Sequence, residues 1–258
     1  MTIYIAFDAE TTGLEPGSRM LELAAVAFNG EGEVLAEFSE LISPGMPIPL
    51  DVQAIHGITE ADIAGRMGTR EACIAFLNWI EDVNPDCGVA HFAPYDVGII
   101  SYALGQSGLE LPGLPVIDTC AMAKALKETP NNKLVTVAEH YAIPLGASAH
   151  RALSDATACM QYFCKVKDRA PVIDAPWATT YSHIPEPSTL AGIEAAIASG
   201  SAFSFSYQDQ AGAVTDRTIT PYGFAYNKKA MVEFHGLCHL RNERRTFLAH
   251  RIQSPATP

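Results

Sequence analysis

Two carboxylates near the N-terminus, Asp8 and Glu10, are the residues whose type and spacing most directly indicate chemistry. They follow an apolar run, Ile3 to Phe7, which is typical of a buried strand. Residues i and i+2 of a strand point to the same face, so both side chains are expected side by side at the strand's end. Such like charges repel, and a hard cation such as Mg²⁺ relieves the repulsion by binding carboxylate oxygens. The alternative is a solvated strand end that carries two charges.

Two further segments carry an acid beside apolar sequence. Asp96 follows a short apolar run and lies in the first turn of an expected helix, within HFAPYDVGII. His150 and Asp155 lie at the start of another expected helix, within AHRALSDATACMQYF, whose apolar residues predict an inward-facing side. An acid on or beside a packed face is unusual unless a cation or a partner group compensates it.

The elements that must position these residues alternate between strands and helices. Strands are predicted at residues 3–7, 20–28, 34–42, 87–92 and 115–119, and helices beginning near 69, 94 and 119 and at 134–141 and 151–166. The Pro- and Gly-rich segment 43–59 is predicted to be a long functional loop. Three strands followed by alternating strands and helices predict an α/β domain with a mixed sheet. Ligand sites of such sheets lie at the carboxyl ends of the strands, where Asp8 is expected.

The pattern changes near residue 169, which indicates a second unit. Residues 169–187 contain four prolines and are predicted to be a linker. A helix at 190–200 and then short segments that alternate with period two predict a small β-barrel. The predicted organisation is a domain at 1–168, a linker at 169–187 and a second domain at 188–258.

The composition is that of a soluble globular protein, with 48% hydrophobic and 18% charged residues among 258. No apolar run reaches the ~20 residues that a membrane helix needs, so no membrane association is expected. The N-terminus has no basic region of the kind that begins a signal peptide. The six cysteines form no C-x-x-C pair and are interpreted as reduced core residues of a cytoplasmic protein.

The net charge of −12 is unevenly distributed along the chain. Residues 1–170 carry 10 basic and 22 acidic side chains, whereas residues 171–258 carry 7 of each. The overall acidity argues against a protein that coats duplex DNA, but it is compatible with an enzyme that admits one strand to a metal-filled site. Arginines interspersed with Phe and Tyr near the C-terminus suit single-stranded nucleic acid or phosphate. The alternative is a solvated basic face.

Together the motifs resemble the DEDDh exonucleases of the DnaQ-like type. The matching segments are FDAETTGL, HGIT, HFAPYD and AHRALSDA, in that order, and VIDT at 116–119 also fits. Family members often have Asn after the His of the second motif, where this chain has Phe92. The resemblance covers residues 3–165 and implies an RNase H-like mixed sheet flanked by helices.

The resemblance implies that four acids bind two divalent ions, Mg²⁺ or Mn²⁺: Asp8, Glu10, Asp96 and Asp155. It implies that His150 is the general base, a role that suits a side chain titrating near neutral pH. Two such ions stabilise the attacking and leaving oxygens of an in-line phosphoryl displacement. It also implies that four residues lie against the terminal nucleotide: Thr11, Thr12, Gly13 and Leu14. A role in the core stays open for Leu14 and for His56, which is a further candidate substrate contact.

The segment from Leu190 to Ile252 resembles a WYL domain, a small SH3-like barrel. The matching residues are Tyr207, Arg217, Pro221, Gly236, Cys238, Arg241, Arg245, Phe247, Arg251 and Ile252. The tripeptide that gives this family its name is replaced by Val232-Glu233-Phe234. The resemblance implies a pocket for nucleic acid or a nucleotide ligand, lined by arginines: Arg217, Arg241, Arg245 and Arg251.

The sequence therefore predicts a metal-dependent 3′→5′ exonuclease that releases nucleoside 5′-monophosphates, with single-stranded DNA favoured and with a C-terminal binding module. The direction and the product come from the resemblance, and a role in DNA repair would fit. The alternative is a regulatory nucleic-acid-binding protein whose nuclease-like part is a non-catalytic scaffold, against which the intact acid set argues. The sequence leaves four questions open: whether the substrate is DNA or RNA, whether it is single- or double-stranded, whether the protein is a homodimer, and whether it associates with a polymerase.

Overall fold

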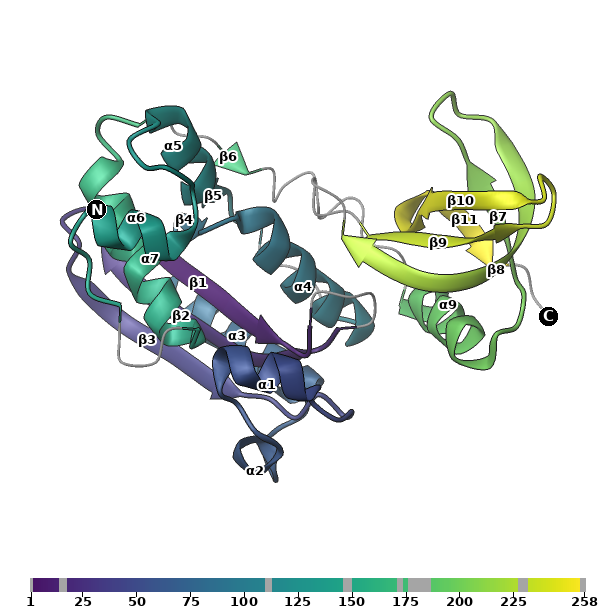
Figure 1. Cartoon of the computed structure of the whole chain (residues 1–258), viewed down its shortest axis with the longest axis horizontal. Coiled ribbons are helices and arrows are strands. Elements are labelled where there is room, and N and C mark those ends of the chain that lie inside the picture. Colours follow the sequence, from purple (N-terminus) through teal and green to yellow (C-terminus); the bar gives the residue numbers. More distant parts are fainter. Residues whose placement is uncertain are drawn as a thin grey trace.

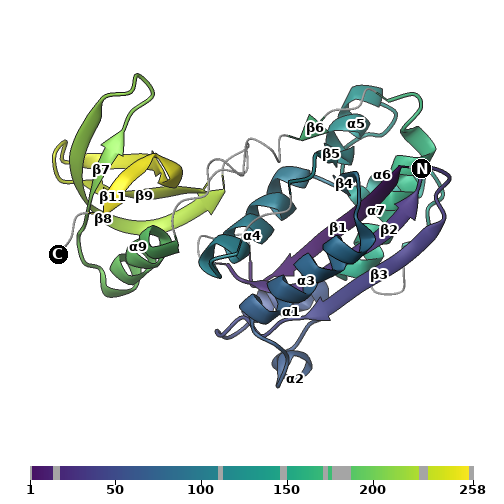
Figure 2. The ribbon, with the colours of Figure 1, turned by 180° about the vertical axis from the view of Figure 1, so that it is seen from behind.

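The computed structural model of the chain describes residues 2–13, 18–109, 113–145, 150–170, 174–175, 187–226 and 232–255. It contains two β-sheets, one in each half of the chain (Figure 1; Figure 2 shows the reverse side). The first has the strand order β3-β2-β1-β4-β5-β6, and the second has the order β10-β9-β8-β7-β11. No helix in the described ranges is long and apolar enough to cross a membrane.

The first sheet is mixed, as the sequence predicts. Its strands are β1 (Ile3–Thr11), β2 (Met20–Asn29), β3 (Val34–Leu41), β4 (Cys87–Ala90), β5 (Val116–Asp118) and β6 (Asp174–Ala175). β1 runs antiparallel to β2 and parallel to β4. The β2–β3 turn is closed by Asn29, whose Oδ1 accepts hydrogen bonds from the backbone N–H groups of Glu31 and Glu33. β6 falls within the segment predicted to be a linker and pairs with β5.

Helices cover both faces of this sheet, because alternate strand residues are apolar on each side. The helices are α1 (Leu50–His56), α2 (Glu60–Ile63), α3 (Thr69–Val83), α4 (Ala93–Gln106), α5 (Thr119–Leu126), α6 (Leu134–His140) and α7 (Ala152–Val166). Helices α3 and α4 pack on the face that holds Ile5 and Phe7, whereas α5, α6 and α7 pack on the face that holds Ala6 and Phe28. The result is a three-layer α/β unit (Figure 1).

The segment 43–59, expected to be a loop, contains helix α1, so this expectation was wrong in part. The helix ends at Gly57, whose φ of 72° gives the left-handed C-cap that glycine adopts readily. Leu50 and Ile55 are exposed (83% and 59%), so the helix has no apolar face directed toward the core. The periodicity from which a helix is predicted is therefore absent here.

The second sheet is antiparallel and consists of five strands. They are β7 (Phe203–Gln208), β8 (Val214–Tyr226), β9 (Val232–Cys238), β10 (Glu243–Leu248) and β11 (Ile252–Pro255), accompanied by α9 (Pro187–Ser199) and the 3-10 helix η1 (Ala249–Arg251). Phe205, Phe234 and Phe247 form its core with Ile193 of α9. The described residues contain no pairing between β10 and β11 that would close a barrel, so the closed SH3-like barrel stays a prediction.

Candidate active site

Asp8 and Glu10 lie near the carboxyl end of β1 and project from the same face of the sheet, toward helix α7. Side chains alternate between the two faces along a strand, so Phe7 and Ala9 point to the other face and belong to the apolar layer there. β4 pairs with β1 only from Tyr4 to Ala6, which leaves the last part of β1 without a neighbour on that side. The two acids therefore lie where β1 extends beyond the parallel strands.

Asp96 fills part of the space beyond β4. It lies in the first turn of α4, is buried (3% exposed), and its Oδ1 accepts a hydrogen bond from the backbone N–H of Ala9 at 3.1 Å. This N–H has no strand partner because β4 has already ended. The contact fixes helix α4 against the strand that carries Asp8 and Glu10.

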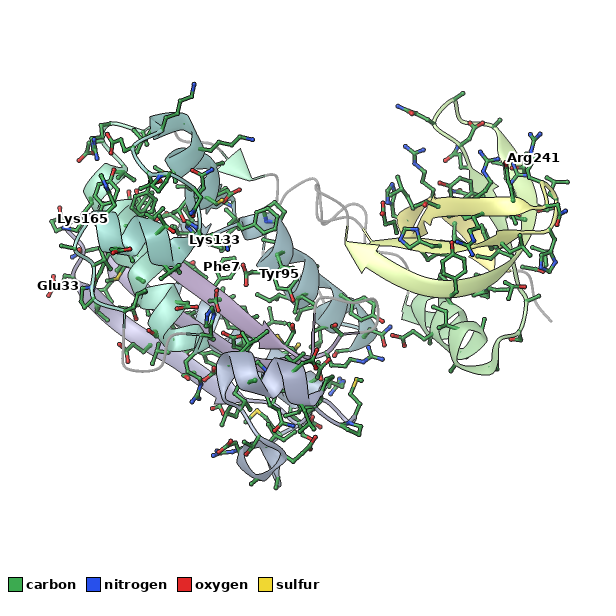
Figure 3. The ribbon with its side chains drawn as sticks, viewed as in Figure 1. Phe7, Glu33, Tyr95, Lys133, Lys165 and Arg241 are labelled. Carbon is green, nitrogen blue, oxygen red and sulfur yellow. The ribbon has the colours of Figure 1, made fainter. Side chains whose placement is uncertain are left out.

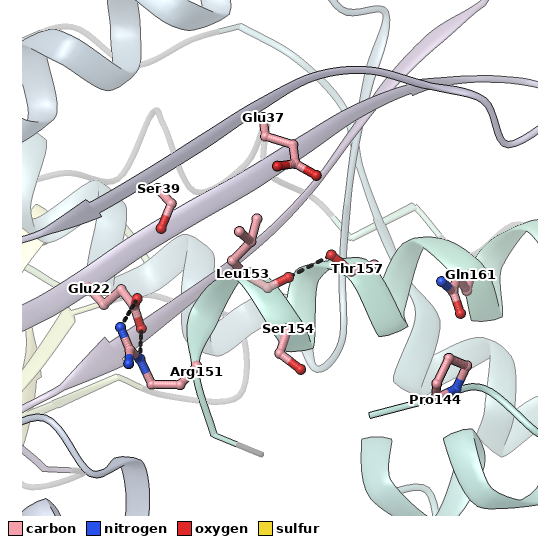
Figure 4. A pocket seen from close by; sticks show the side chains of 9 residues that line it. All are labelled: Glu22, Glu37, Ser39, Pro144, Arg151, Leu153, Ser154, Thr157 and Gln161. Atoms are coloured by element: carbon pink, nitrogen blue, oxygen red, sulfur yellow. Dashed lines mark hydrogen bonds and ion pairs between the residues drawn. The ribbon is translucent and has the colours of Figure 1, made fainter. Parts of the chain in front are cut away.

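Asp155 is carried by α7, whose start is anchored by a charged pair. Arg151 donates to both carboxylate oxygens of Glu22 on β2, from Nε at 3.0 Å and from NH2 at 2.8 Å (Figure 4). The backbone N–H of Ala152, the first residue of the helix, donates to the same carboxylate at 3.0 Å. Glu22 thus caps α7 from the neighbouring strand and directs Asp155 toward β1.

Three carboxylates come together at this point. One oxygen each of Asp8, Glu10 and Asp155 lies within 4.8 Å of the others. Asp96 is not a member of this group of three, but its charge acts more strongly on Asp8 than that of any other residue. The structure therefore brings together acids from β1, α4 and α7, which are up to 147 residues apart in the sequence.

The electrostatics of the cluster favour a bound cation. Burial, with the charges of Asp96 and Glu10, raises the pKa of Asp8 well above its usual range. Burial and the nearby Asp155 raise the pKa of Glu10 to about 7. Burial also raises the pKa values of Asp96 and Asp155. Each ionised form is costly without compensation, and a divalent cation with oxygen ligands provides that compensation, so the donor set fits Mg²⁺ or Mn²⁺.

A cavity of about 710 Å³ adjoins the cluster. Its lining includes Glu10, His56, Tyr95 and His150. His150 is exposed, has a φ of 64° and lines the cavity together with Glu10. A volume of this size is within the range of small-molecule sites and is sufficient for one nucleotide.

The turn after β1 forms another wall of the cavity. Thr11 Oγ1 donates to the carbonyl of Gly13 at 2.8 Å and lies 2.8 Å from the hydroxyl of Tyr95. The side chain and backbone of Thr12 bind the backbone of Arg19, each at 2.8 Å. Thr11, Thr12 and Gly13 thus line the cavity as a fixed turn. Leu14, the fourth predicted contact, lies outside the described residues.

His56 also lines the cavity and is buried (4% exposed). Its Nδ1 accepts a hydrogen bond from the backbone N–H of Ile58 at 2.9 Å, which fixes Nε2 as the protonated nitrogen. Nε2 makes no hydrogen bond of normal geometry among the described residues, although the backbone of Thr11 lies near the ring. A buried donor that lacks a well-formed hydrogen bond is costly, so Nε2–H is available to donate to a ligand oxygen.

The arginines predicted in the C-terminal unit are distributed over several elements. Arg217 lies on β8, Arg245 on β10 and Arg251 in η1. Arg241 lies in the turn between β9 and β10, at the end of the second sheet far from Tyr95 (Figure 3). None of the four lines the cavity beside the carboxylates. The NH1 atom of Arg217 is buried and has no hydrogen-bond partner among the described residues.

Two residues of the site were not identified from the sequence. Glu22 lies within the apolar run MLELAAVAF. A single acid in a fully buried strand is unusual unless it is paired, and this is the only sequence signal that could have indicated its role. Tyr95 directly precedes Asp96, and no local pattern distinguishes it from a core aromatic residue. His91, which directly precedes Phe92, binds Thr119 and the carbonyl of Asn132 through its two ring nitrogens.

An RNase H-like α/β fold with an acidic cluster near the carboxyl end of β1 defines the class of the protein: it is an exonuclease of the DnaQ-like, DEDDh type. The chain belongs to the exonuclease family, whose model (RNase_T) matches residues 5–163. The model of the WYL domain matches residues 188–257.

Known proteins are similar to this chain in sequence, and a known structure is similar to it in fold. DNA polymerase III subunit epsilon of Treponema pallidum is 34% identical over 164 residues, which cover 62% of this chain and 74% of that protein. DNA polymerase III PolC-type of Bacillus cereus is 34% identical over 157 residues, but these represent 60% of this chain and only 11% of that much longer protein. The nuclease domain of 3′hExo, a DEDDh family member determined with bound rAMP, superimposes with a TM-score of 0.58 at 14% identity and covers 67% of this chain and 95% of that one.

Proposed function

We propose that the chain is a metal-dependent 3′→5′ exonuclease that hydrolyses single-stranded DNA to nucleoside 5′-monophosphates. The observation that carries this proposal is the group of Asp8, Glu10 and Asp155, whose oxygens lie within 4.8 Å of one another beside a cavity of about 710 Å³. The related proteins named above belong to DNA polymerase III, which favours DNA as the substrate.

The acidic residues would hold the cofactor. Asp8, Glu10 and Asp155, with Asp96 beside them, supply the hard oxygen donors that Mg²⁺ or Mn²⁺ prefers. When bound, two such ions would neutralise the carboxylates and stabilise the charge that develops on the phosphate during displacement.

The remaining steps are assigned to side chains of this chain. The turn formed by Thr11, Thr12 and Gly13 would hold the terminal nucleotide, with Nε2 of His56 as a donor to one of its oxygens. A ring nitrogen of His150 would take a proton from water while the water oxygen bonds to phosphorus. The P–O3′ bond then breaks, the leaving oxygen is protonated, and a nucleoside 5′-monophosphate and a shortened strand result.

We further propose that the chain divides into a nuclease domain at 1–168, a linker at 169–187 and a WYL domain at 188–258 that binds nucleic acid or a nucleotide ligand. The guanidinium of Arg217 supports such a binding role, because its buried NH1 atom has no partner in the described ranges. This observation is also what favours the alternative function, a regulatory binding protein.

A digestion assay tests the catalytic proposal. The full chain is incubated with 3′-labelled single- and double-stranded DNA and RNA, with Mg²⁺ and with a chelator. We expect nucleoside 5′-monophosphates from single-stranded DNA, and no product with the chelator. Replacing Asp8 with Asn should lower kcat by more than about 100-fold. Loss of a residue that only hydrogen-bonds to a metal ligand typically costs about 10–100-fold, and loss of the ligand itself should cost more.

The matched control is Glu81→Gln, which removes one exposed carboxylate from α3, on the opposite face of the sheet from α7. Its kcat should stay within twofold of the natural chain. Undiminished hydrolysis by Asp8→Asn would contradict the proposed site. Binding of single-stranded DNA without hydrolysis by the natural chain, lost in Arg217→Ala, would support the regulatory alternative instead.

A further inference from the structure

A second groove, of about 480 Å³, adjoins the proposed catalytic cavity. We call it the Arg70 groove and define it by Ser18, Arg19, Thr69, Arg70, Tyr102 and Gln106. Ser18 also lines the cavity that holds His56 and His150, so the two spaces meet at this residue. The groove therefore lies next to the cavity that would hold the terminal nucleotide.

The groove is basic within an acidic part of the chain. Residues 1–170 carry 12 more acidic than basic side chains, yet two arginines line this space, and in the described part of the chain the one carboxylate that contacts them, Glu194 of α9, pairs with Arg19 and leaves Arg70 uncompensated. The other polar residues of the groove are hydroxyl and amide side chains, which also bind phosphate oxygens. The groove is therefore electrostatically suited to a polyanion, in contrast to its surroundings.

Arg70 is exposed and has no ion-pair partner among the residues that the structure describes. An unpaired guanidinium can bind a phosphate without first releasing a carboxylate. Its planar donors match two phosphate oxygens at once, which makes Arg a preferred contact for nucleic-acid backbones.

Arg19 already binds an anionic group in the same groove. Its NH2 atom lies 3.0 Å from Oε1 of Glu194 on α9, and its NH1 atom donates to the hydroxyl of Tyr102 at 3.3 Å. The N–H groups of Arg19 and the O–H of Tyr102 thus donate to the oxygens of a carboxylate at this place. Phosphate oxygens present the same chemistry.

We propose that the Arg70 groove binds the phosphate backbone of a single strand on the 5′ side of the terminal nucleotide. This inference rests on the proposed function for the direction of the strand. The groove would extend the substrate contact beyond one nucleotide, so that affinity increases with the length of the strand.

Equilibrium binding tests the proposal without requiring hydrolysis, so it stays interpretable if the exonuclease assignment fails. The full chain carrying Asp8→Asn, which prevents cleavage, is titrated into fluorescein-labelled oligothymidylates of about 4 and about 20 nucleotides, a range that spans common single-strand site sizes. The matched pair of second-site changes is Arg70→Glu and Lys165→Glu. Both reverse one exposed charge, and Lys165 lies on the opposite side of the first sheet from α4 (Figure 3).

We expect Arg70→Glu to raise Kd for the long strand by about tenfold and Arg70→Ala by less, with a smaller effect on the short strand. The magnitude of the slope of log K against log salt should fall by about 0.7 for each phosphate that the variant no longer binds. Lys165→Glu should change Kd less than twofold. Equal weakening by Arg70→Glu and Lys165→Glu, or no change in Arg70→Glu, would overturn the proposal.

Discussion

Phe92 has an unfavourable backbone conformation beside the acidic cluster. Its φ of 67° is in the left-handed region, which costs a bulky residue roughly 1–2 kcal/mol. The carboxylate of Asp118 holds it there, since Oδ1 accepts a hydrogen bond from the N–H of Phe92 at 3.1 Å. Its side chain is 54% exposed and contributes little packing in return. Asn tolerates such a φ better.

Replacing Phe92 with Asn should therefore stabilise the protein by about 1 kcal/mol, because the strain is relieved and little buried surface is lost. The free energy of unfolding in urea measures this change. Phe92→Ala is the control, since it removes the ring but keeps a side chain that disfavours this φ. Equal stabilities of the Asn and Ala variants would contradict the explanation from backbone strain.

Helix α7 shows how one element depends on another that is distant in the sequence. Glu22 and Arg151 are separated by 129 positions, and Glu22 is 3% exposed. The carboxylate satisfies both the guanidinium and the N–H of Ala152, so it supports the start of the helix that carries Asp155. Because Arg151 is 37% exposed, water weakens the ion pair, and the buried N–H accounts for much of the effect of losing Glu22.

Replacing Glu22 with Gln should destabilise the chain by about 1–3 kcal/mol, the cost of poorly satisfied buried polar groups. It should also lower kcat by about 10–100-fold, since Asp155 loses the support of its helix. Thermal unfolding and the digestion assay measure the two effects. The control is Glu37→Gln on β3, an exposed acid that lines the same surface pocket as Glu22 and Arg151 (Figure 4). Comparable losses in both variants would exclude a specific role for Glu22.

Local patterns were sufficient to predict most elements of the first unit. The strand at 20–28 corresponds to β2 and the helix at 151–166 to α7, because their apolar periodicity follows from burial. The same patterns missed α1, whose Leu50 and Ile55 are exposed. Local sequence patterns also did not predict the ion pair between Glu22 and Arg151, because it depends on how α7 packs against β2 in the folded chain. The acids were found because charges are rare beside packed faces.

At the scale of the whole molecule, the two units meet at a contact between α4 and α9. Tyr102 donates a hydrogen bond to Glu194, and the guanidinium of Arg19 lies 5.7 Å from the centre of the Tyr102 ring. Tyr102 is 7% exposed and packs with the core of the second sheet. Two units in one chain usually move relative to each other unless their interface is large and hydrophobic, so these specific groups are candidates for holding the units together.

Replacing Glu194 with Ala should weaken this contact, because Arg19 loses its ion-pair partner and Tyr102 loses its acceptor. We expect amide hydrogen exchange of α9 to accelerate about five- to tenfold, equivalent to roughly 1 kcal/mol, while exchange in β1 and β2 stays unchanged. Mass spectrometry of peptides from the exchanged full chain measures both regions.

The control for this change is Glu233→Ala on β9, which removes an acid that lies 3.8 Å from Nε2 of His235 within the second sheet. If the contact between α4 and α9 holds the two units together, only Glu194→Ala will alter exchange in the C-terminal half of α4. That half contains Tyr102, so its response reports on the junction and not on α9 alone. The same exchange in α4 for both variants would mean that the units are held by other contacts, and that Glu194 serves α9 locally.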